Sequence, residues 1–179
     1  MIPFGSGPYN MAADAELLLK AETKGETGLR VYGWDGAWVT LGMFQSADRD
    51  LLPSCPVPYV SRRTGGCAVL NGHDVTVGFA EPLSRIAPPG TDPASIARSM
   101  RTVYRHMVSP LIRALRTVGV MAELGESYRA RTHQHDLPPR SSDCFAHAAN
   151  NDVVEERYGA KVCGCALRVT EKAALLQAS

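Results

Sequence analysis

The apolar residues change their spacing twice along the chain, and this limits the fold more than any other feature. Between residues 29 and 83, β-branched and aromatic residues form short runs separated by turn dipeptides, a pattern typical of strands. From 92 to 119 the apolar residues instead recur every three or four positions, which predicts one long helix. After residue 152 short apolar runs return and predict three more strands, within 152–156, 160–170 and 173–177. Strands, one long helix and strands again predict an α+β fold.

Local signals predict where several elements begin and end. Residues 9–23 are rich in alanine and leucine and predict a first helix, with Asn10 as its cap. Residues 29–34 and 37–44 flank Asp35-Gly36, a dipeptide that favours a tight turn, so a hairpin is expected and a first half made mostly of antiparallel sheet.

The long helix has its own boundary signals. Asp92 can cap it, Pro93 suits its first turn, and Pro110 could kink it. The polar residues 125–143 predict a loop.

Size and charge limit what the chain can do. With 179 residues, 45% of them hydrophobic, it can form one core, so we expect a single domain over 1–179. A net charge of +1 gives no overall field that would attract nucleic acid or an anionic membrane. The sequence has no signal-peptide pattern and no apolar stretch of about 20 residues, so a cytoplasmic protein is expected. Its five cysteines are odd in number and sparse, which favours free thiols.

Residues 61–69 place two arginines beside a glycine pair. Glycines let a ligand approach the backbone, and the guanidinium groups of Arg62 and Arg63 could hold a phosphate or carboxylate. The alternative is an ordinary turn with two solvated arginines.

Three further side chains could carry chemistry. His73, followed by Asp74, could be an acid, a base or a metal ligand, or simply a turn residue. Cys144 follows Arg140 and two histidines, which could lower its thiol pKa, but a buried inert cysteine fits equally well. Lys161 opens a strand of small and apolar residues, where it could polarise an acyl carbonyl or guard a strand edge.

Four residues could in principle bind zinc: His133, His135, Cys163 and Cys165. Both pairs have one-residue spacing, which does not match the usual zinc-knuckle spacing. We therefore expect no metal site.

Three motifs in order resemble the superfamily of lipoate-protein ligase A, octanoyltransferases and biotin-protein ligases. Residues 38–45, WVTLGMFQ, are similar to the family's strand that ends in a leucine-glycine-x-phenylalanine-glutamine element, and residues 62–76, RRTGGCAVLNGHDVT, to its arginine and double-glycine signature. Residues 161–166, KVCGCA, are similar to its lysine motif, and 175–179 to its leucine-glutamine strand. The similarity begins at Asn10 and runs the length of the chain.

The resemblance implies a mixed, largely antiparallel sheet flanked by helices, as in the biotin/lipoate ligase-like (class II synthetase-like) catalytic domain. It implies that Cys144 and Lys161 are catalytic, since Cys144-Phe145 matches the element that carries the nucleophile in cysteine-dependent octanoyltransferases. It also implies a substrate-binding set formed by residues of the double-glycine and lysine strands: Arg62, Arg63, Thr64, Gly65, Gly66, Ala68, Asn71, His73, Gly164 and Ala166.

The activity implied is transfer of an octanoyl or lipoyl group from acyl carrier protein to a lysine of a lipoyl domain, through a cysteine thioester and without a cofactor. Acceptors would be lipoyl domains of 2-oxoacid dehydrogenases or the glycine cleavage H protein. An ATP-dependent lipoate ligase, using ATP and magnesium to form an acyl-adenylate, is the first alternative. A non-catalytic acyl-binding homologue is the second.

Relatives in this superfamily continue beyond the point that matches Ser179, so the chain is expected to lack their usual C-terminal extension. We therefore expect the last strand to be an unpaired sheet edge. Because exposed edges invite pairing with another chain, a second subunit or a homodimer is also expected.

Overall fold

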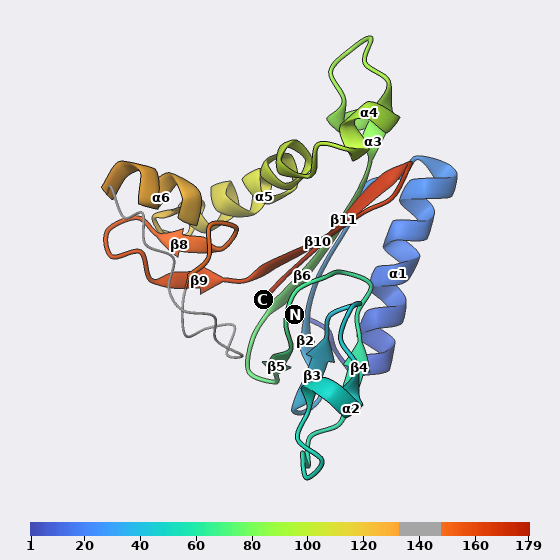
Figure 1. The fold of residues 1–179 in the computed structure, drawn as a ribbon, viewed down its shortest axis with the longest axis vertical. Coiled ribbons are helices and arrows are strands. Elements are labelled where there is room, and N and C mark those ends of the chain that lie inside the picture. The colour runs from blue at the N-terminus through green and yellow to red at the C-terminus, as the bar shows by residue number, and fades with distance from the viewer. Residues whose placement is uncertain (133–147) are drawn as a thin grey trace.

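The computed structural model describes residues 1–132 and 148–179 and confirms the α+β fold (Figure 1). Its main sheet has five strands in the order β1-β2-β6-β11-β10. These strands are β1 (Phe4–Gly5), β2 (Gly28–Trp34), β6 (Thr76–Pro82), β11 (Ala173–Ala178) and β10 (Cys165–Val169). All neighbours are antiparallel except β1 and β2, so the prediction of a largely antiparallel sheet is confirmed.

Two three-stranded sheets flank the main one. In the first, β3 (Trp38–Leu41) pairs in parallel with β4 (Tyr59–Ser61) and antiparallel with β5 (Val69–Asn71). In the second, β8 (Val153–Glu155) lies between β7 (Ala122–Leu124) and β9 (Lys161–Cys163), antiparallel to both.

Two 18-residue helices cover opposite faces of the main sheet. Helix α1 (Gly7–Lys24) packs Leu18 against Leu175 of β11, and α5 (Met100–Thr117) covers Leu176 on the other face. Successive strand residues point to opposite faces, so β11 contributes to both layers of the core. Four short helices complete the described fold: α2 (Ala47–Asp50), α3 (Leu83–Ile86), α4 (Pro93–Ala97) and α6 (Gly125–Thr132).

The predicted hairpin between residues 29–34 and 37–44 is wrong. Strand β2 pairs with β1 and β6, whereas β3 pairs with β4 and β5 in another sheet. The turn at Asp35 is anchored by tertiary contacts, because its amide donates to the Gly5 carbonyl and its carboxylate accepts from the Trp38 indole. The turn therefore carries the chain from one sheet to the next.

The predicted helix boundaries need two corrections. Ser6, not Asn10, caps α1, since its hydroxyl accepts from the Tyr9 amide, while the Asn10 amide side chain donates to the carbonyls of Gly5 and Gly33. The segment 92–119 forms two helices, because Ser99 leaves helical geometry between α4 and α5. Asp92 caps α4 as predicted, by accepting from the Ala94 amide.

Three predictions for the second half also change. The first eight residues of the predicted loop 125–143 form α6, and residues 133–143 lie outside the described residues. The predicted strand 160–170 is two strands in two sheets, with Gly164 between them. Strand β11 is not an unpaired edge, because it pairs with β6 on one side and β10 on the other.

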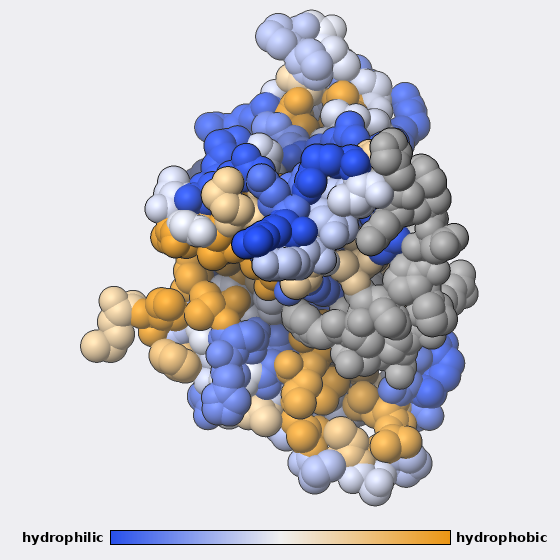
Figure 2. All heavy atoms as spheres, turned by 90° about the vertical axis from the view of Figure 1, so that its left-hand side faces the viewer, coloured by the Kyte–Doolittle hydropathy of each residue, from blue (hydrophilic) through white to orange (hydrophobic). Residues whose placement is uncertain are grey.

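The surface is divided between polar and apolar regions. Figure 2 shows polar side chains over the upper part of one face, at the level of α5 and α6 in Figure 1, and apolar side chains exposed below them. Across residues 1–132 and 148–179, no helix combines the length and the apolar character needed to cross a membrane.

Candidate active site

The double-glycine loop between β4 and β5 is held in shape by Arg62. The Arg62 side chain is buried, and its guanidinium donates to the carbonyls of Thr40 (3.0 Å), Gly65 (2.7 Å) and Cys67 (2.8 Å). Arg63, the next residue, is exposed. Arg62 therefore fixes the loop backbone from inside, and Arg63 is the arginine whose side chain reaches solvent.

A buried polar network connects this loop to β11 and α1. The Thr64 hydroxyl donates to the Gln177 side-chain carbonyl at 2.6 Å, and the Gln177 amide donates to the Asp14 carboxylate at 2.6 Å. Asp14 also accepts from Arg30 and from the Tyr32 hydroxyl, each at 2.6 Å. Burial and the neighbouring Asp14 charge raise the pKa of Tyr32, so its hydroxyl stays protonated as a donor.

The loop also packs closely against β3 and β10. A Cβ atom on Gly42 would collide with the carbonyl oxygen of Gly66, so only glycine fits there. Gly66 has φ +92°, in the left-handed region that favours glycine, and a Cβ there would lie 4.0 Å from that of Ala166. Gly66 and Ala166, predicted from separate motifs, are therefore brought together.

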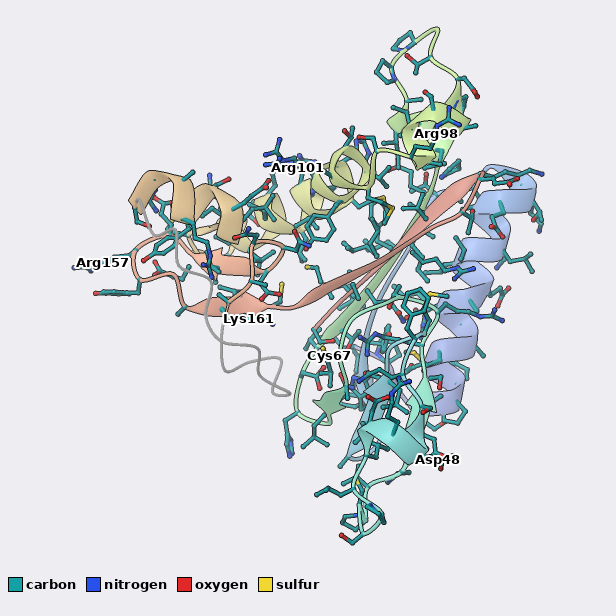
Figure 3. All side chains as sticks on the ribbon, viewed as in Figure 1. Asp48, Cys67, Arg98, Arg101, Arg157 and Lys161 are labelled. Carbon is teal, nitrogen blue, oxygen red and sulfur yellow. The ribbon has the colours of Figure 1, made fainter. Side chains whose placement is uncertain are left out.

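Lys161, at the start of β9, pairs with Asp152 near the start of β8. Its Nζ lies 3.1 Å from an Asp152 carboxylate oxygen, and the two side chains are only 8% and 11% exposed. A Cβ on Gly164 would approach Nζ to 3.3 Å, so this glycine leaves room for the ammonium group. Lys161 is therefore an enclosed, charge-paired lysine, not a solvated lysine at a strand edge. Figure 3 labels Lys161 on β9 and Cys67 in the double-glycine loop.

Asn71 and His73 lie in different settings. The Asn71 amide is buried and donates to the Thr40 hydroxyl and the Val69 carbonyl, both at 3.1 Å. His73 is exposed, and the Asp74 carboxylate instead accepts from the Gly72 amide and the Thr76 hydroxyl. Asp74 therefore stabilises the turn. Among the residues that the structure describes, there is no His73–Asp74 hydrogen bond.

Cys144, the predicted nucleophile, lies outside the described residues, as do His133 and His135. The described chain on either side is anchored: Arg129 of α6 donates to the Ala148 carbonyl, and the Ala149 amide donates to Asp152 at 2.7 Å. Asp152 thus contacts both Lys161 and the segment that follows residue 147. Within residues 1–132 and 148–179, no three His, Cys, Asp or Glu side chains are grouped to hold a metal ion.

Comparison with known proteins identifies the family. The model of the lipoyl protein ligase A/B catalytic domain matches residues 6–179. The chain belongs to this family. Among curated members it is 32% identical over 179 residues to octanoyltransferase LipM of Kyrpidia tusciae, covering 97% of this chain and 61% of that protein. It is 29% identical over 177 residues to LipM of Bacillus subtilis, covering 96% of this chain and 60% of that protein.

This lipoyl protein ligase A/B domain also has the fold of solved ligases. A lipoate-protein ligase A crystallised with ATP superposes with a TM-score of 0.64 at 19% identity, over 99% of this chain and 64% of the ligase. A bi-partite lipoate protein ligase from Thermoplasma acidophilum gives a TM-score of 0.59 at 20% identity, over 99% of this chain and 58% of that one. The biotin/lipoate ligase-like fold expected from the sequence is therefore confirmed.

The site of this family member contains residues that sequence reasoning did not assign. Asp152 was part of a predicted strand, and nothing in its spacing from Lys161 indicates that a strand pair brings the two together. Gln177 stands in the leucine-glutamine strand motif and Asp14 in the first predicted helix, and neither was assigned a role. The signal for both was polarity, because each is a polar residue within an otherwise apolar helix face or strand.

Proposed function

We propose that this chain is the catalytic part of an octanoyltransferase, which moves an octanoyl or lipoyl group from acyl carrier protein to a lysine of a lipoyl domain. The observation that carries the proposal is the 32% identity to a LipM octanoyltransferase across 97% of the chain. The chain spans about 60% of the length of the curated relatives it matches, so the activity of the whole protein is part of the proposal.

The proposed reaction has two acyl transfers. The Cys144 thiolate attacks the carbonyl carbon of the octanoyl thioester, and the resulting tetrahedral oxyanion collapses to release the carrier thiolate and leave an octanoyl-cysteine. The neutral amine of the acceptor lysine then attacks the new thioester. An amide forms, and the proton lost by the amine is taken up by the sulfur of Cys144, which leaves as a thiol.

The remaining site residues would bind and polarise the acyl group. Lys161, enclosed beside Asp152, would lie near the acyl carbonyl, and the backbone amides of Gly65 and Gly66 would stabilise the oxyanion. Other residues of the same strands would bind the substrate: Arg62, Arg63, Thr64, Ala68, Asn71, His73, Gly164 and Ala166. Because Arg62 is buried among backbone carbonyls, its contribution would be to shape the binding loop.

No cofactor is required in this mechanism, because a thioester is already activated for acyl transfer. Acyl carrier protein would be the donor, and lipoyl domains of 2-oxoacid dehydrogenases or the glycine cleavage H protein the acceptors. The reaction would take place in the cytoplasm. A ligase would instead need ATP and magnesium to activate a free acid.

Intact-mass spectrometry tests the proposal directly. The protein is incubated with octanoyl-acyl carrier protein in one sample and with octanoate, ATP and magnesium in another. An octanoyl adduct is expected from the carrier alone, is expected to be absent in Cys144→Ala, and is expected to persist in Cys55→Ala, a cysteine in a separate turn.

Two other outcomes would count against this chain acting as an octanoyltransferase by itself. An acyl-adenylate that forms only with ATP would establish a ligase. No acyl species in either sample would favour a non-catalytic acyl-binding protein or one that needs a second subunit.

A further inference from the structure

Cys163 and Cys165 flank the point where the chain passes from one sheet to another. Cys163 pairs with Val153 in the β7–β8–β9 sheet, and Cys165 pairs with Ala178 in the five-stranded sheet. Between them, Gly164 exchanges two backbone hydrogen bonds with Ser179, of 2.8 and 3.1 Å. The three residues Cys163, Gly164 and Cys165, called the joint below, therefore connect the two sheets.

The two thiols of the joint are in contact. Their sulfur atoms lie 3.9 Å apart, and both side chains are partly buried. The Tyr104 hydroxyl, which donates to the Asn151 carbonyl, and the Lys161–Asp152 pair lie beside them. A dithiol is thus placed next to the lysine of the candidate active site.

The surroundings give the two thiols different acidities. The hydrogen bond with Cys165 lowers the pKa of Cys163. Burial and the Asp152 charge oppose this lowering, and the Lys161 charge adds to it. The same hydrogen bond and burial raise the pKa of Cys165. Because the thiolate is the nucleophile in thiol–disulfide exchange, Cys163 is the thiol suited to attack and Cys165 the one that follows.

We propose that Cys163 and Cys165 are a redox modification site, which forms an intramolecular disulfide by exchange with a low-molecular-weight disulfide such as oxidised glutathione. The Cys163 thiolate attacks one glutathione sulfur, forming a mixed disulfide and releasing one glutathione thiolate. Cys165 then loses its proton and attacks the Cys163 sulfur, which releases the second glutathione. The two cysteines are oxidised by two electrons, and the glutathione disulfide is reduced to two thiols.

The joint can adopt the required geometry only by moving. A disulfide needs a sulfur separation of about 2 Å, and its Cα atoms usually lie about 5.5–6 Å apart. The two sulfur atoms now lie 3.9 Å apart. Residues two apart in an extended strand are separated by about 6.4–6.8 Å, so the backbone between them has to shorten. Gly164 is the residue that must bend, and it lies against the Lys161 side chain, 3.3 Å from Nζ to the position of a Cβ. Closing the disulfide therefore shifts the Lys161 side chain.

This movement bears on the candidate active site because its two halves lie on either side of the joint. Lys161 belongs to the β9 side, whereas the double-glycine loop rests on Ala166 and Gln177 of the five-stranded sheet. The disulfide would alter the position of Lys161 relative to that loop and slow acyl transfer. That effect rests on the proposed function, but formation of the disulfide does not.

The test measures the mass of one tryptic peptide that contains both cysteines. The folded protein is incubated with oxidised glutathione, then unfolded, alkylated without reduction and digested with trypsin, which cuts after Lys161 and Arg168. Peptide 162–168 contains Cys163 and Cys165 and no other cysteine. It is expected to appear about 2 Da lighter than the reduced peptide and without alkyl groups, and to take up two alkyl groups if the sample is first reduced.

Single variants separate the roles of the two thiols. Cys165→Ser is expected to stop at the mixed disulfide, with glutathione on Cys163, because the resolving thiol is missing. Cys163→Ser is expected to gain glutathione much more slowly. The proposal is overturned if wild-type peptide 162–168 carries two alkyl groups while the exposed Cys67 in the same sample has reacted with glutathione.

A second measurement addresses activity. Oxidised wild-type protein is expected to form the octanoyl adduct at least several-fold more slowly than the oxidised Cys163→Ser/Cys165→Ser variant, in which any oxidation of Cys144 still occurs. Equal rates of adduct formation would overturn the proposed effect on Lys161. The disulfide itself would still be decided by the peptide masses. If reduced wild-type protein also forms no adduct, the proposed function fails, and the peptide masses still decide the disulfide.

Discussion

The side-chain oxygens of Thr64 and Gln177 lie 2.6 Å apart in the interior, joining the double-glycine loop to strand β11 of the main sheet. Gln177 continues the connection to Asp14 of α1, so one buried chain of hydrogen bonds unites the double-glycine loop, β11 and α1. Buried polar groups of this kind are costly when a partner is lost, so substitutions at Thr64 and Asp14 should reveal that cost.

Removing the Thr64 hydroxyl should impair the loop more than removing its methyl group. Thr64→Val leaves the Gln177 carbonyl buried without this donor, at a cost of about 1–3 kcal/mol in unfolding free energy, whereas Thr64→Ser keeps the hydrogen bond. The rate of octanoyl-adduct formation should fall in Thr64→Val and largely recover in Thr64→Ser. Urea unfolding and intact-mass kinetics on both variants check this, and equal behaviour of the two would refute it.

Neutralising Asp14 should destabilise the whole domain. Its carboxylate, 1% exposed, accepts hydrogen bonds from Arg30, Tyr32 and Gln177, so Asp14→Asn leaves a partly buried guanidinium without its counter-charge. A loss of about 3–5 kcal/mol is expected from denaturant unfolding. Asp48→Asn, at an exposed position on α2, is the matched control and should change little.

A methyl group at Gly42 should displace the double-glycine loop. Gly42→Ala places a Cβ in collision with the Gly66 carbonyl oxygen, which is backbone and cannot move alone. Adduct formation should drop by more than tenfold if the Gly66 backbone takes part in catalysis. Gly36→Ala, where a Cβ would meet nothing within 4 Å, is the control and should keep its activity. A similar loss of activity in Gly36→Ala would show that the collision is not the cause.

The packing of β11 against α5 should contribute strongly to the free energy of unfolding. Leu176, 1% exposed, packs in the cluster that contains Val103 and Met107, so Leu176→Ala should cost about 2–5 kcal/mol. Leu70→Ala, at a side chain that is 68% exposed, should cost within about 0.5 kcal/mol. Thermal and urea unfolding of the two variants would show whether the difference holds.

The Glu126 ion pairs should make stability depend on pH. Burial alone would raise the Glu126 pKa, but hydrogen bonds from Arg105 and Arg101 of α5 hold it below its ordinary value. Because the folded-state pKa is lowered, the stabilisation is full above the ordinary carboxyl pKa and is lost as pH falls through the folded pKa. Wild type should therefore exceed Glu126→Gln in stability at neutral pH and lose this advantage in acid, as pH-dependent unfolding would reveal.

The sequence predicted elements better than it predicted their partners. Alternation and turn residues located β6 and β11, and helical spacing located α1 and α5, because these signals depend on neighbours within a few residues. The pairing of β2 with β6 and of β3 with β4 depends on which sheet each strand joins, and a favourable turn dipeptide such as Asp35-Gly36 carries no information about that choice.

The candidate site shows the same division. The motifs indicated Thr64, the glycine pair and Lys161, but not that Arg62 would be used inside the loop or that Asp152 would pair with the lysine. Both relationships join segments through tertiary packing, and a buried charge pair is recognised only once its two strands are adjacent. Cys144 lies outside the described residues and stays a prediction.

The hydrogen bond between Thr64 and Gln177 spans 113 residues, and the one between Gln177 and Asp14 spans 163. Contacts so distant in sequence must close large loops before they contribute stability, which makes folding slow. The double-glycine loop therefore cannot take its final form during synthesis until residue 177 has left the ribosome. A nascent chain interrupted before residue 177 would lack the partner that anchors this loop, so the domain gains its site only after that residue is made.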